Sequence, residues 1–82
     1  MARPRIAVIG TGAWGLSHVR TFAAEPAAAL TWVCDRDPAA LGRAVRVAPA
    51  ARATTDLAEL FAARDVDGVV IAVQRGTPLA EV

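Results

Sequence analysis

The stretch IAVIGTGAWG, Ile6–Gly15, constrains the fold of this chain more than any other feature of its sequence. A short run of branched apolar residues, Arg5–Ile9, leads directly into three closely spaced glycines. Such a run is typical of a strand that is buried on both faces in a parallel sheet. Helical spacing of apolar residues follows and ends at Pro26; its members are Leu16, Val19, Phe22 and Ala23. The pattern predicts a strand, a tight glycine turn and a helix.

The remaining sequence continues to alternate between strand and helix patterns. We expect a strand at 30–34, a helix capped by Asp37 with Pro38 in its first turn, and a short strand near 47–52, weakened by Pro49. A further helix is predicted in DLAELFAARD, where Asp56 and Glu59 have capping-box spacing; Leu57, Leu60 and Phe61 should share a face. A turn at 65–68 and a strand at 69–73 complete the series, which indicates an α/β fold with a parallel sheet.

Composition excludes several classes of function. The chain has 82 residues and a net charge of +1, with no basic run, which argues against nucleic acid or an anionic membrane as the main partner. No segment approaches the ~20 apolar residues that span a bilayer, so we expect a cytoplasmic location. The single cysteine, Cys34, lies in an apolar run and is interpreted as a buried thiol rather than a reactive one. We predict no metal site and no catalytic residue; His18 is interpreted as a surface or packing residue.

The glycine loop matches the pattern G-x-G-x-x-G between a strand and a helix. Gly10 would allow a tight turn, Gly12 would let a pyrophosphate approach the backbone, and Gly15 would allow close contact between helix and strand. The first helical N–H groups, near Ala13 and Trp14, would point at the bound anion. We expect the Trp14 ring to pack rather than to react. The alternative is a glycine-rich turn that binds nothing.

An acidic residue strengthens the interpretation of this loop as a ligand site. Asp35 follows the second predicted strand, 20 residues after Gly15, where a carboxylate can accept hydrogen bonds from both ribose hydroxyls of an adenosine. A carboxylate there favours NAD over NADP, because it repels the 2′-phosphate of NADP. Arg36 leaves NADP possible, since a guanidinium could bind that phosphate or stack on adenine. The alternatives are a turn aspartate and a solvated surface arginine.

Taken in series, these motifs resemble the N-terminal domain of the glucose–fructose oxidoreductase, inositol dehydrogenase and rhizopine-catabolism family. The matching segments are IAVIGTGAWGLSHVRTFAAEP, LTWVCDRDP, TTDLAELFAARDVDGVVIAV and the PLAE near the end. The resemblance implies a Rossmann-like sheet of about four strands, in the order 3-2-1-4 with helices on both faces, and an NAD(P)-dependent oxidation of sugar CH–OH groups. It implies that the loop residues bind the pyrophosphate, that Asp35 and Arg36 hold the adenosine, and that Ala72 and Val73 flank the nicotinamide half. The loop residues are Gly10, Thr11, Gly12, Ala13, Trp14 and Gly15.

The sequence also departs from this family. Gln74 stands where a proline is usual, and Thr77 is followed directly by Pro78 rather than by histidine. The family's catalytic lysine belongs to an E-K-P motif further on, and this sequence contains no lysine. We therefore expect residues 1–82 to be a partial dinucleotide-binding domain, without the substrate domain and without turnover of its own.

Other interpretations remain open. An exposed apolar edge strand at 69–73 would favour self-association. The chain could thus be an interaction module whose glycine loop is empty, or an incomplete or frame-shifted copy of a longer oxidoreductase.

Overall fold

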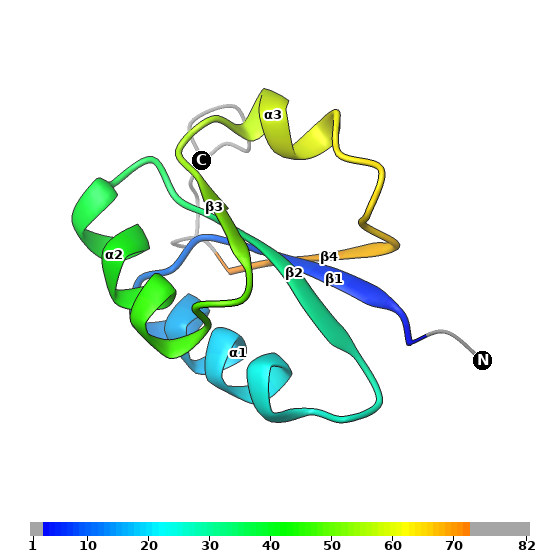
Figure 1. Ribbon diagram of the computed structural model, residues 1–82. Helices are drawn as coiled ribbons and strands as arrows, with labels where there is room; N and C mark the ends of the chain where they lie inside the picture. Colours follow the sequence, from blue (N-terminus) through cyan, green and yellow to red (C-terminus); the bar gives the residue numbers. More distant parts are fainter. Residues whose placement is uncertain (1–2, 73–82) are drawn as a thin grey trace.

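Four parallel strands form one sheet in the order β3-β2-β1-β4 in the computed structural model, which describes residues 3–72 (Figure 1). This confirms the predicted α/β architecture and strand order. The elements in chain order are β1 Arg5–Ile9, α1 Ala13–Ala24, β2 Ala29–Cys34, α2 Pro38–Val47, β3 Arg52–Thr54, α3 Leu57–Phe61 and β4 Gly68–Ile71.

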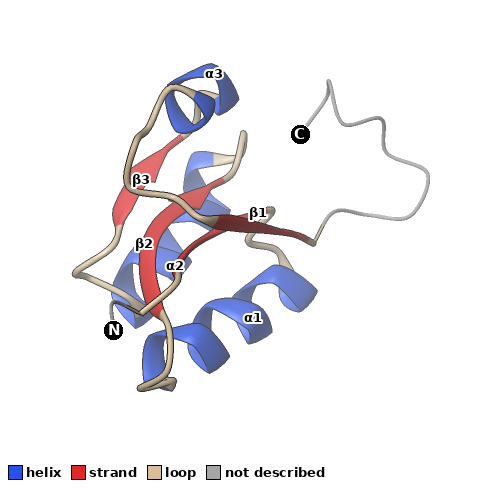
Figure 2. Ribbon diagram, turned by 90° about the vertical axis from the view of Figure 1, so that its right-hand side faces the viewer, coloured by secondary structure: helices blue, strands red, loops and turns tan. Residues whose placement is uncertain are grey.

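The helices divide between the two faces of the sheet, with α1 and α2 on one face and α3 on the other (Figures 1 and 2). Alternate residues of β1 serve the two layers: Val8 joins the cluster under α1 and α2, whereas Ala7 and Ile9 join the cluster under α3. All three side chains are fully buried, which explains the continuous apolar run in the sequence. The buried residues under α1 and α2 are Val8, Val19, Val33, Leu41, Ala44 and Ala48; those under α3 are Ala7, Ile9, Trp32, Cys34 and Leu60.

The third strand is not where the sequence pattern placed it. Strand β3 covers Arg52–Thr54, and the predicted range 47–52 overlaps it only at Arg52, because α2 continues to Val47. Helix α2 buries Ala40, Leu41 and Ala44 at helical spacing, and this packing outweighs the strand preference of the valines near its end. Pro49 lies in the turn that follows, where Ala51 N–H donates to the Ala48 carbonyl at 3.1 Å.

Helix α3 is shorter than the predicted helix, and it buries fewer of its apolar side chains. Asp56 caps the helix by accepting from Ala58 N–H at 2.9 Å, but α3 has only five residues. Leu60 is buried and Leu57 packs against it, whereas Phe61 is 60% exposed, so the face predicted for these three residues is buried only in part. Within the described residues, the Glu59 carboxylate accepts no hydrogen bond from the Asp56 N–H, so the capping box is not completed.

Strand β4 also differs from its prediction. It begins at Gly68 and ends at Ile71, and Val73 lies outside the described residues. Its side chains alternate between half-buried and exposed positions, with Val69 42% and Ile71 50% exposed. The strand is therefore covered on the α1 face but largely open on the α3 face.

Two polar contacts hold the start of β4 and the α3–β4 turn against the sheet. The Arg5 side chain donates to both carboxylate oxygens of Asp67, at 3.1 and 3.0 Å, and these bonds lower the pKa of Asp67 to about 2. Trp32 Nε1–H donates to Asp65 Oδ1 at 2.8 Å, which lowers the pKa of that carboxyl. The buried indole thus has a partner for its only polar group.

Candidate cofactor-binding site

The predicted site residues gather at the carboxyl ends of β2, β1 and β4. The glycine loop follows β1, Asp35 follows β2, and Ala72 follows β4. Strand β1 lies between the other two: the chain proceeds from β1 to β2 and β3 on one side and then returns to β4 on the other side, so the strand order reverses at β1. Ligands of open α/β sheets bind at such a point, outside the carboxyl ends of the strands.

Two of the three loop glycines are required by the fold itself. Gly10 has a φ of 88°, in the left-handed region that residues with a Cβ avoid, and its N–H donates to the Cys34 carbonyl at 2.8 Å. A Cβ on Gly15 would lie 1.6 Å from the Gly10 carbonyl oxygen, which no side chain can occupy. Gly15 therefore lets the start of α1 lie directly against the turn, as predicted.

Gly12 differs from the other two glycines. Its φ of −68° is accessible to any residue, it is exposed, and a Cβ built on it would meet no atom within 4 Å. Neither backbone strain nor packing explains glycine at this position. The open space over Gly12 fits the approach of a ligand to the backbone.

Of the three described helices, α1 alone has no side-chain cap at its N-terminus. Asp37 caps α2 and Asp56 caps α3, whereas Gly12 caps α1 with no side chain. Leu16 N–H makes the first helical bond, to the Gly12 carbonyl at 2.7 Å. Within residues 3–72, the N–H groups of Ala13 and Trp14 have no acceptor, and they lie at the positive end of the helix dipole.

Asp35 is joined to the glycine loop by hydrogen bonds that the sequence pattern did not reveal. Its Oδ2 accepts from both Thr11 N–H, at 2.7 Å, and Thr11 Oγ1–H, at 3.1 Å, while its Oδ1 accepts from Asp37 N–H at 2.8 Å. Its own N–H donates to the Thr54 carbonyl at 3.2 Å. The one sequence signal for this contact is a hydroxyl residue between the first two glycines. The half-buried carboxylate thus lies beside the glycine turn.

Of the flanking residues, Trp14 does not behave as predicted. Its ring is 82% exposed, so it does not pack in the described part of the molecule. His18, one helical turn further on, is also exposed, which confirms its interpretation as a surface residue. Arg36 is exposed in the turn between β2 and α2, next to Asp35.

Ala72 closes the other side of the loop. Its N–H donates to the Ile9 carbonyl at 2.8 Å, and its Cβ would lie 3.6 Å from a Cβ on Gly15. Ala72 therefore borders the first turn of α1. Val73, predicted beside it, lies outside the described residues.

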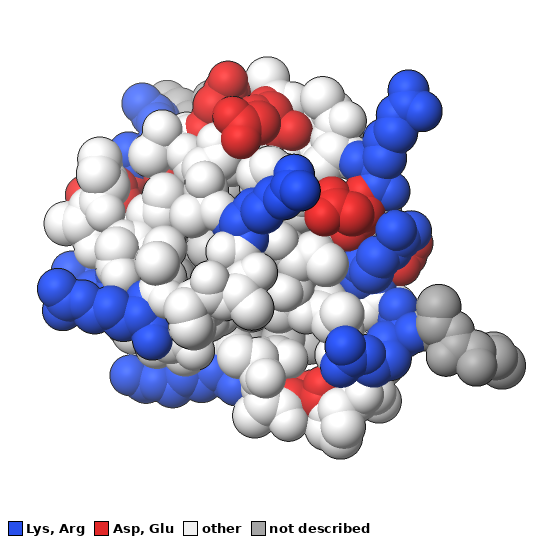
Figure 3. Space-filling view, in the orientation of Figure 1, with Lys and Arg blue, Asp and Glu red and all other residues white. Residues whose placement is uncertain are grey.

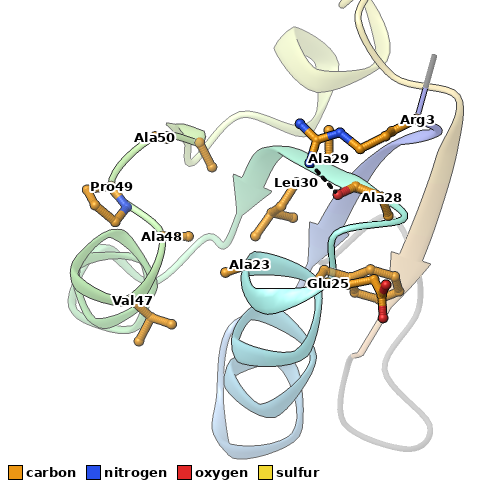
Figure 4. A pocket seen from close by; sticks show the side chains of 12 residues that line it. Arg3, Ala23, Glu25, Ala28, Ala29, Leu30, Val47, Ala48, Pro49 and Ala50 are labelled. Atoms are coloured by element: carbon orange, nitrogen blue, oxygen red, sulfur yellow. Dashed lines mark hydrogen bonds between the residues drawn. The ribbon is translucent and has the colours of Figure 1, made fainter. Parts of the chain in front are cut away.

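A hollow of the described surface lies at the opposite end of the sheet (Figure 4). It measures about 280 Å³ and is lined mainly by alanine and other apolar side chains near the ends of α1 and α2. Arg3 and Glu25 are its charged members, and Arg3 already donates to the Ala28 carbonyl at 3.4 Å. It brings together no pair of groups suited to catalysis, so the glycine loop remains the better candidate site.

The charges and metal-ligand groups of residues 3–72 point to no other class of site. On the face shown in Figure 3, arginine side chains are scattered, most of them around the edge, with acidic side chains among them on the right, and most of the surface is uncharged. Residues 3–72 contain no group of three His, Cys, Asp or Glu side chains placed to hold a metal ion. None of the helices in this range has the length and apolar character required to cross a membrane.

Cys34 is a buried thiol, as predicted. Its side chain is fully buried at the end of β2, and this burial, together with Asp35, raises the pKa of the thiol to about 11. A thiol with a raised pKa is a poor nucleophile at neutral pH. Cys34 therefore belongs to the core under α3.

Comparison with known proteins agrees with this geometry. The model of a family described as "Oxidoreductase family, NAD-binding Rossmann fold" matches residues 4–79. Inositol 2-dehydrogenase 2 of Paenarthrobacter aurescens (strain TC1) is 43% identical over 75 residues, which are 89% of this chain and 22% of that protein.

Two solved structures show the same fold. GenD2 from gentamicin A biosynthesis, in complex with NAD, is 36% identical with a TM-score of 0.79 and covers 89% of this chain and 21% of its own. The myo-inositol dehydrogenase of Lactobacillus casei, in complex with NAD(H) and myo-inositol, is 32% identical with a TM-score of 0.76, over 87% of this chain and 22% of its own. The chain thus spans about a fifth of the length of these proteins.

Proposed function

The chain belongs to the oxidoreductase family with an NAD-binding Rossmann fold, and on this premise we propose that residues 1–82 bind NAD at the glycine loop. The N–H groups of Ala13 and Trp14, which have no acceptor within residues 3–72, would bind the pyrophosphate over Gly12, and Gly10, Thr11 and Gly15 would shape the loop around it. Asp35 would accept from the adenosine ribose, with Arg36 beside the adenine. Ala72 and Val73 would flank the nicotinamide half.

One observation carries this proposal: Gly12 is a glycine that the protein itself does not need. Its φ is negative and the space around its missing Cβ is open. Alanine at this position would cost the fold only a few tenths of a kcal/mol to about 1 kcal/mol, because alanine is a poorer helix cap than glycine. A ligand that touches the backbone there would explain the residue.

The same carboxylate favours NAD over NADP in the proposed site. Asp35 lies beside the loop with its oxygens turned toward Thr11 and Asp37. A 2′-phosphate placed next to this carboxylate would be repelled, whereas a 2′-hydroxyl could donate to it. Arg36, exposed in the same turn, keeps NADP as the second choice.

We further propose that these residues bind the dinucleotide without turning over a substrate by themselves. Bound NAD supplies a hydride acceptor, but a dehydrogenase also needs a group that takes the alcohol proton. The sequence contains no lysine to match the family's catalytic residue. The relatives are about four times as long, so substrate binding would lie in parts of them that these residues do not match. We expect the chain to act in the cytoplasm, where dinucleotide pools are available.

Titration of the purified chain with NADH, by calorimetry and by indole fluorescence, tests the proposal. We expect Gly12→Ala to weaken binding at least about tenfold, because the new methyl group occupies the space of the pyrophosphate. Gly42→Ala is the matched control, since a Cβ on Gly42 in α2 also meets nothing within 4 Å. The absence of binding by the wild-type chain at millimolar NADH would refute the proposal.

A second candidate function rests on the open face of β4. Val69 and Ile71 are exposed on the face that α3 leaves uncovered, and β4 is an edge strand without charged residues or proline. Uncharged edge strands pair readily with other strands. Two chains paired in antiparallel fashion around Val70 would place Val69 of one opposite Ile71 of the other. The alternative is therefore a self-associating module whose glycine loop stays empty.

Sedimentation velocity at several concentrations distinguishes the two candidates. The module interpretation predicts a concentration-dependent dimer that Val69→Lys and Ile71→Lys disrupt, and no response to NADH. A monomer that binds NADH would refute it.

A further inference from the structure

The carboxylate of Asp35 has few free acceptor positions left. An ionised carboxylate offers about four lone-pair positions. Thr11 N–H and Thr11 Oγ1–H occupy the two of Oδ2, and Asp37 N–H occupies one of Oδ1. About one position therefore remains for a ligand, on Oδ1. The sequence pattern had suggested hydrogen bonds to both ribose hydroxyls, whereas the structure leaves room for one direct bond.

Thr11 is placed to act on Asp35 and not on the ligand. Its side chain is fully buried, in contrast to Gly12, Ala13 and Trp14, which are exposed. Its hydroxyl hydrogen is committed to Asp35 Oδ2 at 3.1 Å. A group that is buried within the loop and donates to the carboxylate can influence a bound nucleotide only through that carboxylate.

We propose that Thr11 is a positioning residue that orients Asp35 so that its remaining acceptor receives a single ribose hydroxyl of the dinucleotide. This inference rests on the proposed function. The two bonds from Thr11 hold Oδ2 against the loop and so restrict rotation of the carboxylate before the ligand arrives. Fixing a side chain in advance reduces the entropy lost on binding.

The arrangement also joins the two halves of the adenosine-diphosphate site. Thr11 lies in the turn that would hold the pyrophosphate, and Asp35 lies 24 residues later at the end of β2. A shift of the loop therefore moves the acceptor for the ribose, and the two contacts should respond together to substitution. Side chains within one hydrogen-bond network show such coupling.

The test compares Thr11→Val with Thr11→Ser in NADH titrations. Valine keeps the volume and the N–H bond to Asp35 but removes the hydroxyl, and we expect roughly fivefold weaker binding or more, the size seen for coupled side chains. Serine restores the hydroxyl and should bind within about twofold of the wild-type chain. Thr21→Val is the matched control, because the Thr21 hydroxyl donates to the Ser17 carbonyl at 3.0 Å on the exposed surface of α1.

A double-mutant cycle separates positioning from a general structural effect. In an Asp35→Asn background, Thr11→Val should cause no further loss of affinity, since Thr11 acts through the carboxylate. Equal losses in both backgrounds, or unchanged affinity of Thr11→Val while the wild-type chain binds NADH, would overturn the inference and leave the proposed function intact. If the wild-type chain does not bind NADH, the proposed function itself fails. Should Thr11→Val not fold, as judged by circular dichroism, Thr11→Ala allows the same comparison.

Discussion

The first and second halves of this chain differ in how completely they are packed. In β1, α1, β2 and α2, the strand interiors are fully buried, and the turn after β1 is held by a positive-φ glycine and a bond to Cys34. In α3 and β4, the helix has five residues, and the strand exposes Val69 and Ile71, two of its three apolar side chains. The proposed site belongs almost entirely to the first half. The geometry that would hold a pyrophosphate therefore does not depend on a finished sheet.

Gly15→Ala is expected to destabilise the first half of the chain severely. The added Cβ would overlap the Gly10 carbonyl oxygen, which is backbone and cannot move without opening the turn. We expect a destabilisation above about 4 kcal/mol, outside the usual range for one substitution. Thermal unfolding followed by circular dichroism measures it.

The control for this change is Gly42→Ala, which fills open space in α2 and should stabilise the chain by about 1 kcal/mol. A Gly15→Ala variant that unfolds at the wild-type temperature would contradict the packing described for the turn.

A matched pair of isoleucines compares the two halves directly. Ile9 and Ile71 are register partners on β1 and β4 and point to the same face, but Ile9 is fully buried and Ile71 is half exposed. We expect Ile9→Ala to cost 2–5 kcal/mol, roughly the range for buried isoleucine, and Ile71→Ala to cost about 1 kcal/mol or less. Urea denaturation of both variants provides the measurement.

The outcome of this comparison also bears on self-association. If Ile71→Ala lowered the free energy of unfolding as much as Ile9→Ala does, Ile71 would be buried in solution by residues outside those described. If this loss of stability increased with protein concentration, the residues that bury Ile71 would belong to a second copy of the chain.

A smaller effect is expected where β4 is tied to β1. The pKa of Asp67 is lowered from 3.8 to about 2 by the Arg5 side chain, so the folded state holds the charged form more tightly than the unfolded chain does. The stabilisation by this carboxylate is therefore present above pH 4 and is lost as the pH falls from about 4 to 2. Asp67→Asn should lower the urea midpoint slightly at pH 7 and hardly at all at pH 2.

The side chains of Arg5 and Asp67 are 45% and 43% exposed to solvent, which is why the effect should remain small. Arg5→Gln should reproduce the pH dependence of Asp67→Asn, and the double variant should add little. A midpoint difference that stays constant from pH 7 to pH 2 would show that the ion pair is not its cause.

Much of the fold could be predicted because neighbouring residues carry the signal. Local sterics alone specify the strand–turn–helix unit at the start of the chain, which consists of Arg5–Ile9, the three glycines and the helix after them. The third strand could not be placed, since Val47 carries a strand preference that only the packing of α2 against the sheet overrides. The exposure of Phe61 could not be predicted for a related reason: helical spacing shows which residues share a face, but not how far the sheet extends beneath that face.

For the candidate site, the residues could be predicted from the sequence, but some of their contacts could not. The residues Gly10, Gly12, Gly15 and Asp35 were found by spacing, and the structure brings them together at the carboxyl ends of adjacent strands. The hydroxyl of Thr11 was not singled out, because its partner is 24 residues away in the sequence. Trp14 was expected to pack, but an exposed ring cannot be told from a buried one by residue type.

The sequence by itself determined the order of strands and helices and the position of a backbone turn suited to an anion, because those depend on local conformation and on residues three to four positions apart. The pattern suggested a role for each glycine, but only the tertiary structure decided which of them the packing of the fold requires. A Cβ on Gly15 meets backbone brought there by the turn, whereas a Cβ on Gly12 meets nothing. That difference depends on what surrounds each residue in space, and no pattern along the chain contains it.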